Sequence, residues 1–176
     1  QFNSNYVHND TRRGWENNDN NGVTIGTNLT VLPNYADIHQ RPDGSYPYNP
    51  YYNENPFRVI DQFVNTEITN RFIQSVATNY YAFNREHQQL RLGLQFGADL
   101  LATESHLYAP DQAQSQQSAQ SGYSGASRYQ TNRNLSTNWQ LTAVHTFTGA
   151  ALTHTTSTGL VRYGQDLLVT AAQGEG

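Results

Sequence analysis

Alternation of apolar and polar residues along residues 89–102 is the sequence feature that most constrains the fold of this chain. Polar residues or glycine occupy the odd positions from 89 to 99. Apolar side chains occupy every even position, namely Leu90, Leu92, Leu94, Phe96, Ala98, Leu100 and Ala102. A period of two is typical of a β-strand with one apolar and one polar face. Soluble strands average about 5–6 residues, so a strand this long needs a large core or a lipid layer to cover its apolar face.

Composition argues against a large core. The chain has 176 residues, enough for one domain, but only 36% of them are hydrophobic. Charged residues make up just 14%, well below the usual quarter, so the chain is polar without the charge that disordered chains normally carry. A net charge of -4 leaves no basic balance for nucleic acid, and we set that class of partner aside.

Enzyme and cofactor chemistry find no support in the sequence. Cysteine is absent, which excludes disulfides, thiolate metal ligands and a cysteine nucleophile. Neither a glycine-rich phosphate loop nor a GxSxG motif occurs. No apolar run approaches the roughly 18 residues of a transmembrane helix, so any membrane role must use strands. We therefore expect a protein that is not an enzyme and needs no cofactor.

Long strand patterns alternate with short and long connections. Residues 67–102 predict one hairpin with a tight connection near 84–88, and residues 133–172 predict a second hairpin with a turn near 148–150. Residues 9–66 form a long loop region with a short β-branched strand at 23–32, and residues 103–132 form a low-complexity loop without core-forming residues. We predict a single all-β segment over 1–176, an antiparallel meander with short turns on one side and long loops on the other.

The first long loop holds the most promising binding residues. Five prolines between positions 33 and 56 argue against both a helix and a central strand, so we expect an ordered excursion through residue 66. Clustered rings on such a loop can stack on sugars or peptides. The alternative is that they pack the loop onto itself or its neighbours. The rings belong to Tyr46, Tyr48, Tyr51 and Tyr52.

Metal binding is not expected. The spacing of Asn17, Asp19, Asn21 and Gly22 resembles the first half of a calcium loop, but Asn28 stands where a bidentate glutamate is needed. An asparagine-rich turn explains these residues better. The six histidines show no metal-ligand spacing, although His145 and His154 could approach each other across a turn.

Short motifs spread along the chain resemble the barrel of SusC/RagA-type TonB-dependent outer-membrane transporters. They are the Asn17–Gly22 run, Asp43-Gly44-Ser45-Tyr46-Pro47, Tyr48-Asn49-Pro50, Asn55-Pro56, Leu94-x-x-Gly97-Ala98-Asp99, Tyr108-Ala109-Pro110, Ser157-Thr158-Gly159-Leu160 and Asp166-Leu167. The resemblance implies a plugged barrel of roughly 22 strands that imports oligosaccharides or peptides with a surface lipoprotein lid and TonB. About five strands cannot close a barrel, for which eight is the practical minimum, so this chain would be a segment only.

Two hypotheses follow for the apolar faces. In the first, the strands lie in the bacterial outer membrane, with Arg91, Gln95, Asp99, Asn138 and Gln140 facing the lumen. The aromatic residues expected at the interface near the short turns are Tyr80, Tyr81, Phe83 and Phe147, with Tyr108 and Trp139 toward the far edge. The residues expected to face lipid or a core are Leu90, Leu92, Leu94, Phe96, Leu100, Trp139, Leu141 and Phe147.

In the second hypothesis, identical chains add edge to edge and form an extracellular filament or cross-β fibre. Long, weakly charged strands rich in Gln, Asn, Thr and Tyr are what native proteins normally protect from self-pairing. A secreted soluble β-sandwich is a third alternative, and it predicts a compact monomer in plain buffer.

Overall fold

The computed structural model describes residues 1–15, 23–117 and 124–174. In chain order the strands are β1 (Phe2–Arg12), β2 (Val64–Arg85), β3 (Gln88–Ala109), β4 (Ala126–Thr148) and β5 (Thr153–Gly174). Within the described residues, two short helices, α1 (Ile25–Val31) and α2 (Pro56–Gln62), lie in the first long connection. The predicted all-β class is confirmed.

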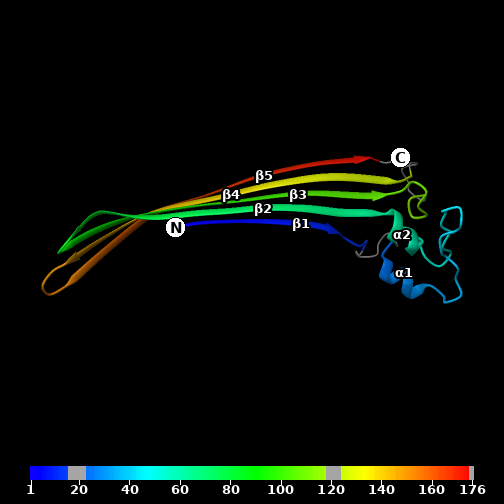
Figure 1. Ribbon diagram of the computed structural model, residues 1–176, viewed down its shortest axis with the longest axis horizontal. Coiled ribbons are helices and arrows are strands. Elements are labelled where there is room, and N and C mark those ends of the chain that lie inside the picture. The colour runs from blue at the N-terminus through cyan, green and yellow to red at the C-terminus, as the bar shows by residue number, and fades with distance from the viewer. Residues whose placement is uncertain (16–22, 118–123, 175–176) are drawn as a thin grey trace. The chain divides into compact units, whose positions relative to one another are not determined.

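The strands form one antiparallel meander in the order β1-β2-β3-β4-β5 (Figure 1). The sheet is not closed, because β1 and β5 are edge strands that pair on one side only. Residues divide into two compact units, which are described separately. Unit 1 comprises residues 1–8, 69–102 and 132–168, and unit 2 comprises residues 9–68, 103–131 and 169–176.

Both short turns belong to unit 1. β2 and β3 are joined through Glu86 and His87, and β4 and β5 are joined through residues 149–152. The two turns lie together, because the Thr148 amide donates a hydrogen bond of 2.9 Å to the His87 carbonyl.

Side chains of unit 1 divide between two faces of the sheet, which we call the polar face and the apolar face. The polar face carries the odd positions of β3 and the even positions of β4. A β-carbon added to Gly93 would lie 2.5 Å from Thr142 Oγ1, and one added to Gly97 would meet the Asn138 side chain. By alternation, the apolar face carries the other positions of both strands.

Residues 23–32 do not form the predicted strand; that prediction is wrong. They contain α1, in which Asn28 is fully buried and donates through Nδ2 to the Glu54 carbonyl at 2.6 Å. This tertiary contact outweighs the weak strand preference of the β-branched residues. The helix ends before Leu32, which is extended at φ -77° and ψ 124°, as expected for the residue before a proline.

Proline does not exclude a helix from the excursion through residue 66. Pro56 is the first residue of α2, a position at which its missing N–H and fixed φ are tolerated. Asn55 caps the helix, because its side chain accepts hydrogen bonds from the Phe57 and Arg58 amides at 3.0 and 3.4 Å. β2 then begins at Val64, inside the range predicted to be a loop.

The prediction of a loop over 103–132 without core-forming residues is also wrong. β3 continues to Ala109 and β4 begins at Ala126, so the connection is much shorter. Ala109 and Ala113 are fully buried and pack with Val59 and Phe63 in the core of unit 2. Alanine carries little hydrophobic signal in a polar context, although it fits a crowded core well.

Trp15 completes this core. Its ring meets the Phe63 ring edge-on, with centroids 4.9 Å apart and an interplanar angle of 90°. Among the described residues, every buried hydrophobic side chain lies in unit 2, namely Ile38, Val59, Phe63, Ala109 and Ala113. The part of the sheet in unit 1 therefore has no buried apolar core of its own.

Gly97 tests the contact between β3 and β4. We expect Gly97→Val to destabilise unit 1 by roughly 1–3 kcal/mol, because its side chain would overlap the Asn138 amide. Asn138→Ala in the same chain should recover most of the loss. Denaturant unfolding of the single and double variants measures both effects, and an unrescued loss would contradict this account of the contact.

Candidate functional site

The polar face of unit 1 carries a hollow of about 590 Å³. Gly97 lines the hollow and leaves space there, because any larger residue would place its side chain against Asn138. Side chains from four neighbouring strands line it: Ser75, Asp99, Asn138, Tyr163 and Gln165. They supply a hydroxyl, a carboxylate, two amides and a phenol ring. The hollow can therefore hydrogen-bond a polar solute and present an aromatic surface to it.

Arg71 holds the carboxylate of Asp99 in place. Nε of Arg71 donates to Asp99 Oδ1 at 2.9 Å, and Nη2 donates to Oδ2, so the pair is bidentate. Both side chains are partly exposed to solvent, at 48% and 32%. An ion pair in contact with water contributes little to stability. Its main effect is to orient the carboxylate at the rim of the hollow.

The residues predicted to face a lumen fall on this same face. Asp99 and Asn138 line the large hollow, whereas Gln95 and Gln140 line a smaller one of about 150 Å³. Arg91 occupies an odd position of β3 and so shares the face by alternation.

Three residues that line the hollow are not indicated by the sequence pattern, namely Ser75, Tyr163 and Gln165. The last two lie on β5, where apolar residues such as Leu160, Val161, Leu167 and Leu168 occupy positions of both parities. No period of two separates the faces there, so only the pairing of β5 with β4 reveals which residues line the hollow.

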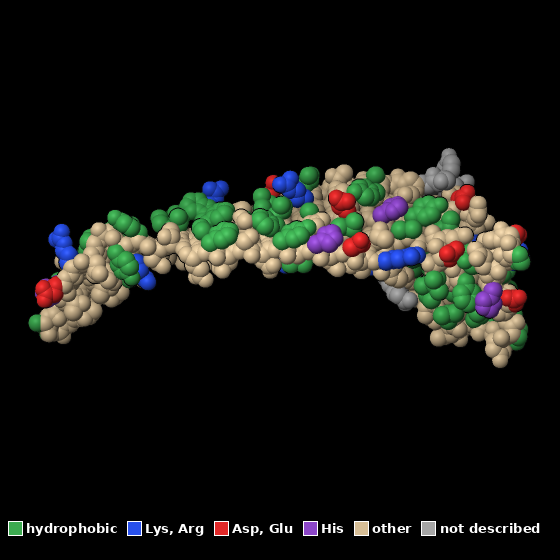
Figure 2. All heavy atoms as spheres, viewed as in Figure 1, with side chains coloured by type: hydrophobic (Ala, Val, Ile, Leu, Met, Phe, Trp, Pro, Cys, Tyr) green, Lys and Arg blue, Asp and Glu red, His purple; other side chains and the backbone are tan. Residues whose placement is uncertain are grey.

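The residues predicted to face lipid or a core all lie on β3 and β4 in unit 1, and none is buried. Leu94 is 43% exposed and Phe96 is 41% exposed. Leu90, Leu92 and Leu100 are half-buried, while Trp139, Leu141 and Phe147 are exposed. Figure 2 shows hydrophobic side chains at the molecular surface along the strands. Within the described residues, no buried core covers this face.

The predicted interfacial aromatic residues flank the two short turns. Tyr80 and Tyr81 are exposed. The Phe83 ring meets the His145 ring edge-on, with centroids 6.1 Å apart. Phe147 lies beside Gly149, at the turn between β4 and β5. The sequence predicts Trp139 toward the far edge. In the structure it lies well inside β4, away from both ends of the strand.

The four loop tyrosines divide into packed and exposed rings. Tyr46 packs onto the protein: its hydroxyl donates to Asp61 at 3.0 Å, and the Arg58 guanidinium lies 5.8 Å from its ring centre. Burial, together with this hydrogen bond, raises the pKa of Tyr46. Tyr52 is half-buried, and its carbonyl accepts from Gln114. These two rings follow the alternative in which the loop packs on its neighbours.

Tyr48 and Tyr51 remain available for stacking. Tyr48 is 69% exposed, and Tyr51 meets Tyr35 edge-on with ring centres 6.3 Å apart. Tyr35 lies outside the cluster seen in the sequence and joins it through the fold of the loop.

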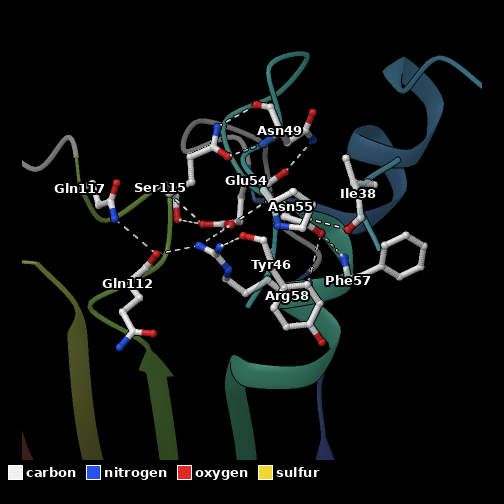
Figure 3. Close-up of polar contacts among 12 residues, drawn as sticks. Ile38, Tyr46, Asn49, Glu54, Asn55, Phe57, Arg58, Gln112, Ser115 and Gln117 are labelled. Carbon is white, nitrogen blue, oxygen red and sulfur yellow. Dashed lines mark hydrogen bonds and ion pairs between the residues drawn. The ribbon is translucent and has the colours of Figure 1, made fainter. Parts of the chain in front are cut away.

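A buried polar cluster fixes the two long connections of unit 2 to each other (Figure 3). Glu54 is fully buried, and its Oε2 accepts from both the amide and the hydroxyl of Ser115 at 2.9 Å. Its Oε1 accepts from the Asn55 amide at 2.8 Å and lies 3.6 Å from Arg58 Nη1. Arg58 also donates to the Gln112 carbonyl at 2.6 Å.

Asn49 and Gln114 extend the cluster. Gln114 accepts from the Asn49 amide and donates to the Asn49 carbonyl, both at 2.8 Å. Asn49 Nδ2 donates to Asn28 and to the Glu54 carbonyl. A carboxylate as fully buried as that of Glu54 needs hydrogen-bond and charge partners of this kind. The cluster therefore sets the shape of the connections that carry the exposed tyrosines.

The described part of the chain contains no group of three or more His, Asp or Glu side chains able to hold a metal ion. The calcium-like spacing at Asn17–Gly22 lies outside the described residues. His145 contacts Phe83, and His154 hydrogen-bonds Thr156 at 2.8 Å.

No family matches. Neither the family models nor the curated proteins compared with the sequence gave a match. The resemblance to outer-membrane transporters thus rests on the motifs of the sequence alone. Among the described residues, no helix has the length and apolar character needed to cross a membrane.

Glu54 tests the buried cluster. We expect Glu54→Gln to destabilise unit 2 by about 3–5 kcal/mol. The substitution removes the buried negative charge that pairs with Arg58, and it can place a donating NH₂ group where the donors of Ser115 need an acceptor. Thermal unfolding and limited proteolysis between residues 110 and 117 should both report the loss. Glu86→Gln, an exposed substitution in a turn, is the matched control and should change neither measurement.

Proposed function

We propose that these strands are a segment of a TonB-dependent outer-membrane β-barrel transporter of the SusC/RagA type, which imports oligosaccharides or peptides. In this role the chain contacts outer-membrane lipid, and the complete transporter works with a surface lipoprotein lid and TonB. The chain has no catalytic role.

One observation carries the proposal: the apolar face of unit 1 is exposed, and no buried hydrophobic residue of the described chain lies in that unit. Leaving an apolar side chain such as Leu94 or Phe96 in water forfeits about 1.5–3 kcal/mol relative to burying it. Lipid would cover such side chains where the strand crosses the bilayer. β3 has 22 residues, about twice the 9–11 needed for a tilted strand to cross a bilayer.

The distribution of connections supports the same proposal. The two short turns lie together in unit 1, and the long connections pack together in unit 2 through Glu54, Arg58 and Ser115. Outer-membrane barrels have short turns on the periplasmic side and long loops outside. The hydrogen-bonding hollow on the polar face fits a water-filled lumen through which a polar solute passes.

A self-assembling β filament is the second candidate function. The observation that favours it is the open sheet: in the described part of the chain, β1 and β5 each pair with a neighbouring strand on one side only. A meridional diffraction repeat of about 4.7–4.8 Å from concentrated material would favour the filament, whereas solubility that depends on detergent without this repeat would favour the barrel.

Matched substitutions on β3 test which face meets lipid. We expect Leu94→Arg to cost about 2–4 kcal/mol in a membrane, because it places a charge on the apolar face. Gln95→Arg, one residue further along on the polar face, should cost little. Denaturant titration of the chain in lipid vesicles compares the two, and equal costs would contradict the proposed orientation.

Tryptophan fluorescence provides an independent test, since the chain has only two tryptophans. In vesicles with brominated acyl chains, we expect strong quenching of Trp139 on the apolar face, measured in the Trp15→Phe variant. Trp15, which packs on Phe63 in unit 2, should be quenched far less in the Trp139→Phe variant. Quenching of Trp15 alone would contradict the membrane role of unit 1.

A further inference from the structure

A cavity of about 270 Å³ lies in unit 2, beside the small hydrophobic core. Two guanidinium groups border it, those of Arg12 and Arg13, where β1 ends. The rest of its wall includes aliphatic and aromatic side chains, namely Trp15, Ile25, Val59 and Phe63. A cavity that joins apolar walls to a few polar groups is typical of a small-molecule site.

The indole N–H of Trp15 is a buried donor in need of an acceptor. Among the described residues, it has no hydrogen-bond partner. A buried donor left unpaired is costly, and nearly all such groups in proteins are paired. Because Trp15 lines the cavity, an acceptor atom of a ligand placed there can pair with this donor.

Arg12 carries a positive charge that no carboxylate balances. Its Nη2 donates to the Ile60 carbonyl at 3.0 Å, and none of the ion pairs among the described residues includes Arg12. Arg13, in contrast, pairs with Glu67. Arg12 is exposed and has five N–H donors, so a ligand can reach it and bind donors that Ile60 does not use.

We propose that this cavity binds a small monocarboxylate with an apolar body, such as an aromatic acid. The carboxylate accepts hydrogen bonds from the Arg12 guanidinium and from the Trp15 indole N–H, and the apolar body lies against Val59 and Phe63. The site goes beyond the proposed transport role and does not depend on it. Its contacts use side chains only, so no strand edge takes part.

The groups around the cavity favour this ligand over other classes. A cation is disfavoured, because arginine is always charged. None of the described side chains that line the cavity carries a strong acceptor, so the hydroxyl donors of a sugar would lack side-chain partners. A dianionic phosphate brings two charges, whereas Arg12 supplies the single unbalanced one.

The site is held in place by contacts that involve no ligand. The Arg13 amide donates to the Asn65 carbonyl at 2.7 Å, and Asn65 Nδ2 donates to the Gly14 carbonyl at 3.4 Å. Trp15 is fixed by its edge-on contact with Phe63. Binding therefore has to order few groups, which lowers its entropic cost.

Fluorescence of Trp15 tests the site in detergent micelles, in a Trp139→Phe background that leaves Trp15 as the only tryptophan. We expect 3-phenylpropionate to change the emission saturably, with half-saturation at roughly 0.1–1 mM, as fits so small a ligand. The alcohol 3-phenylpropanol has the same apolar body without the charge. It should bind roughly tenfold more weakly, because it loses the charged hydrogen bond to Arg12.

Arg12→Gln in the same background separates the charge from the apolar cavity. It should weaken binding of 3-phenylpropionate by roughly tenfold and leave binding of the alcohol unchanged, which shows that the cavity is intact. Arg12→Lys keeps the charge and should retain most of the affinity. Arg162→Gln is the control, since it removes the same charge from an exposed position of β5.

Three results would overturn the proposal: no saturable change with the acid, equal affinity for the acid and the alcohol, or full affinity in Arg12→Gln. The first would mean that the cavity holds water only. None of them bears on the lipid-facing tests of Leu94 and Trp139, so failure of this site and failure of the transport role are distinguishable.

Trp15→Phe tests the indole N–H by isothermal titration calorimetry, which needs no tryptophan. The substitution keeps an aromatic ring beside Phe63 but removes the donor, so affinity for 3-phenylpropionate should fall several-fold. Trp139→Phe is the matched control and should bind as the unchanged chain does. Undiminished affinity in Trp15→Phe would overturn the assigned contact with the carboxylate.

Discussion

Hydrogen bonding between neighbouring strands, without a hydrophobic core beneath them, is the constraint on which unit 1 depends. The ladder satisfies the backbone groups inside the sheet, but it leaves the side chains of Leu94, Phe96 and Trp139 without apolar cover from the chain. An isolated sheet in water gains little from such strands, because burial of apolar area is the dominant favourable term in folding. Within its described residues, unit 1 therefore lacks the buried apolar interior on which a globular protein depends.

Unit 2 is stabilised in a different way. It has a small core around Val59 and Phe63, and beside it a fully buried carboxylate whose partners come from both long connections. Hydrogen bonds of this kind stabilise modestly, yet an unpaired charge at the same place is very costly. The cluster thus specifies one arrangement of the connections more than it adds stability. Such an arrangement keeps exposed rings such as Tyr48 and Tyr51 in fixed positions.

Sequence periodicity predicted the β3–β4 part of the sheet because each side chain there belongs clearly to one face. It failed at residues 23–32, where burial of the Asn28 side-chain amide favours a helix. It also failed at Ala109 and Ala113, because such small side chains give no strong hydrophobic signal in the sequence. Asp99 and Asn138 of the candidate site follow from alternation. Tyr163 and Gln165 do not, since β5 lacks a period of two, and only strand pairing places them beside the hollow.

Glycines on β3 limit how this strand can align with β4. A shift by one residue would turn Leu90, Leu92, Leu94 and Leu100 to the polar face, so the alternation itself opposes it. A shift by two residues keeps every side chain on its own face, so no leucine of the apolar face is moved to the polar face. It would, however, replace the space left at Gly93 and Gly97 with side chains as large as Gln95 or Asp99, directly against Thr142 and Asn138. The two glycines thereby penalise the smallest misalignment that keeps each side chain on its own face.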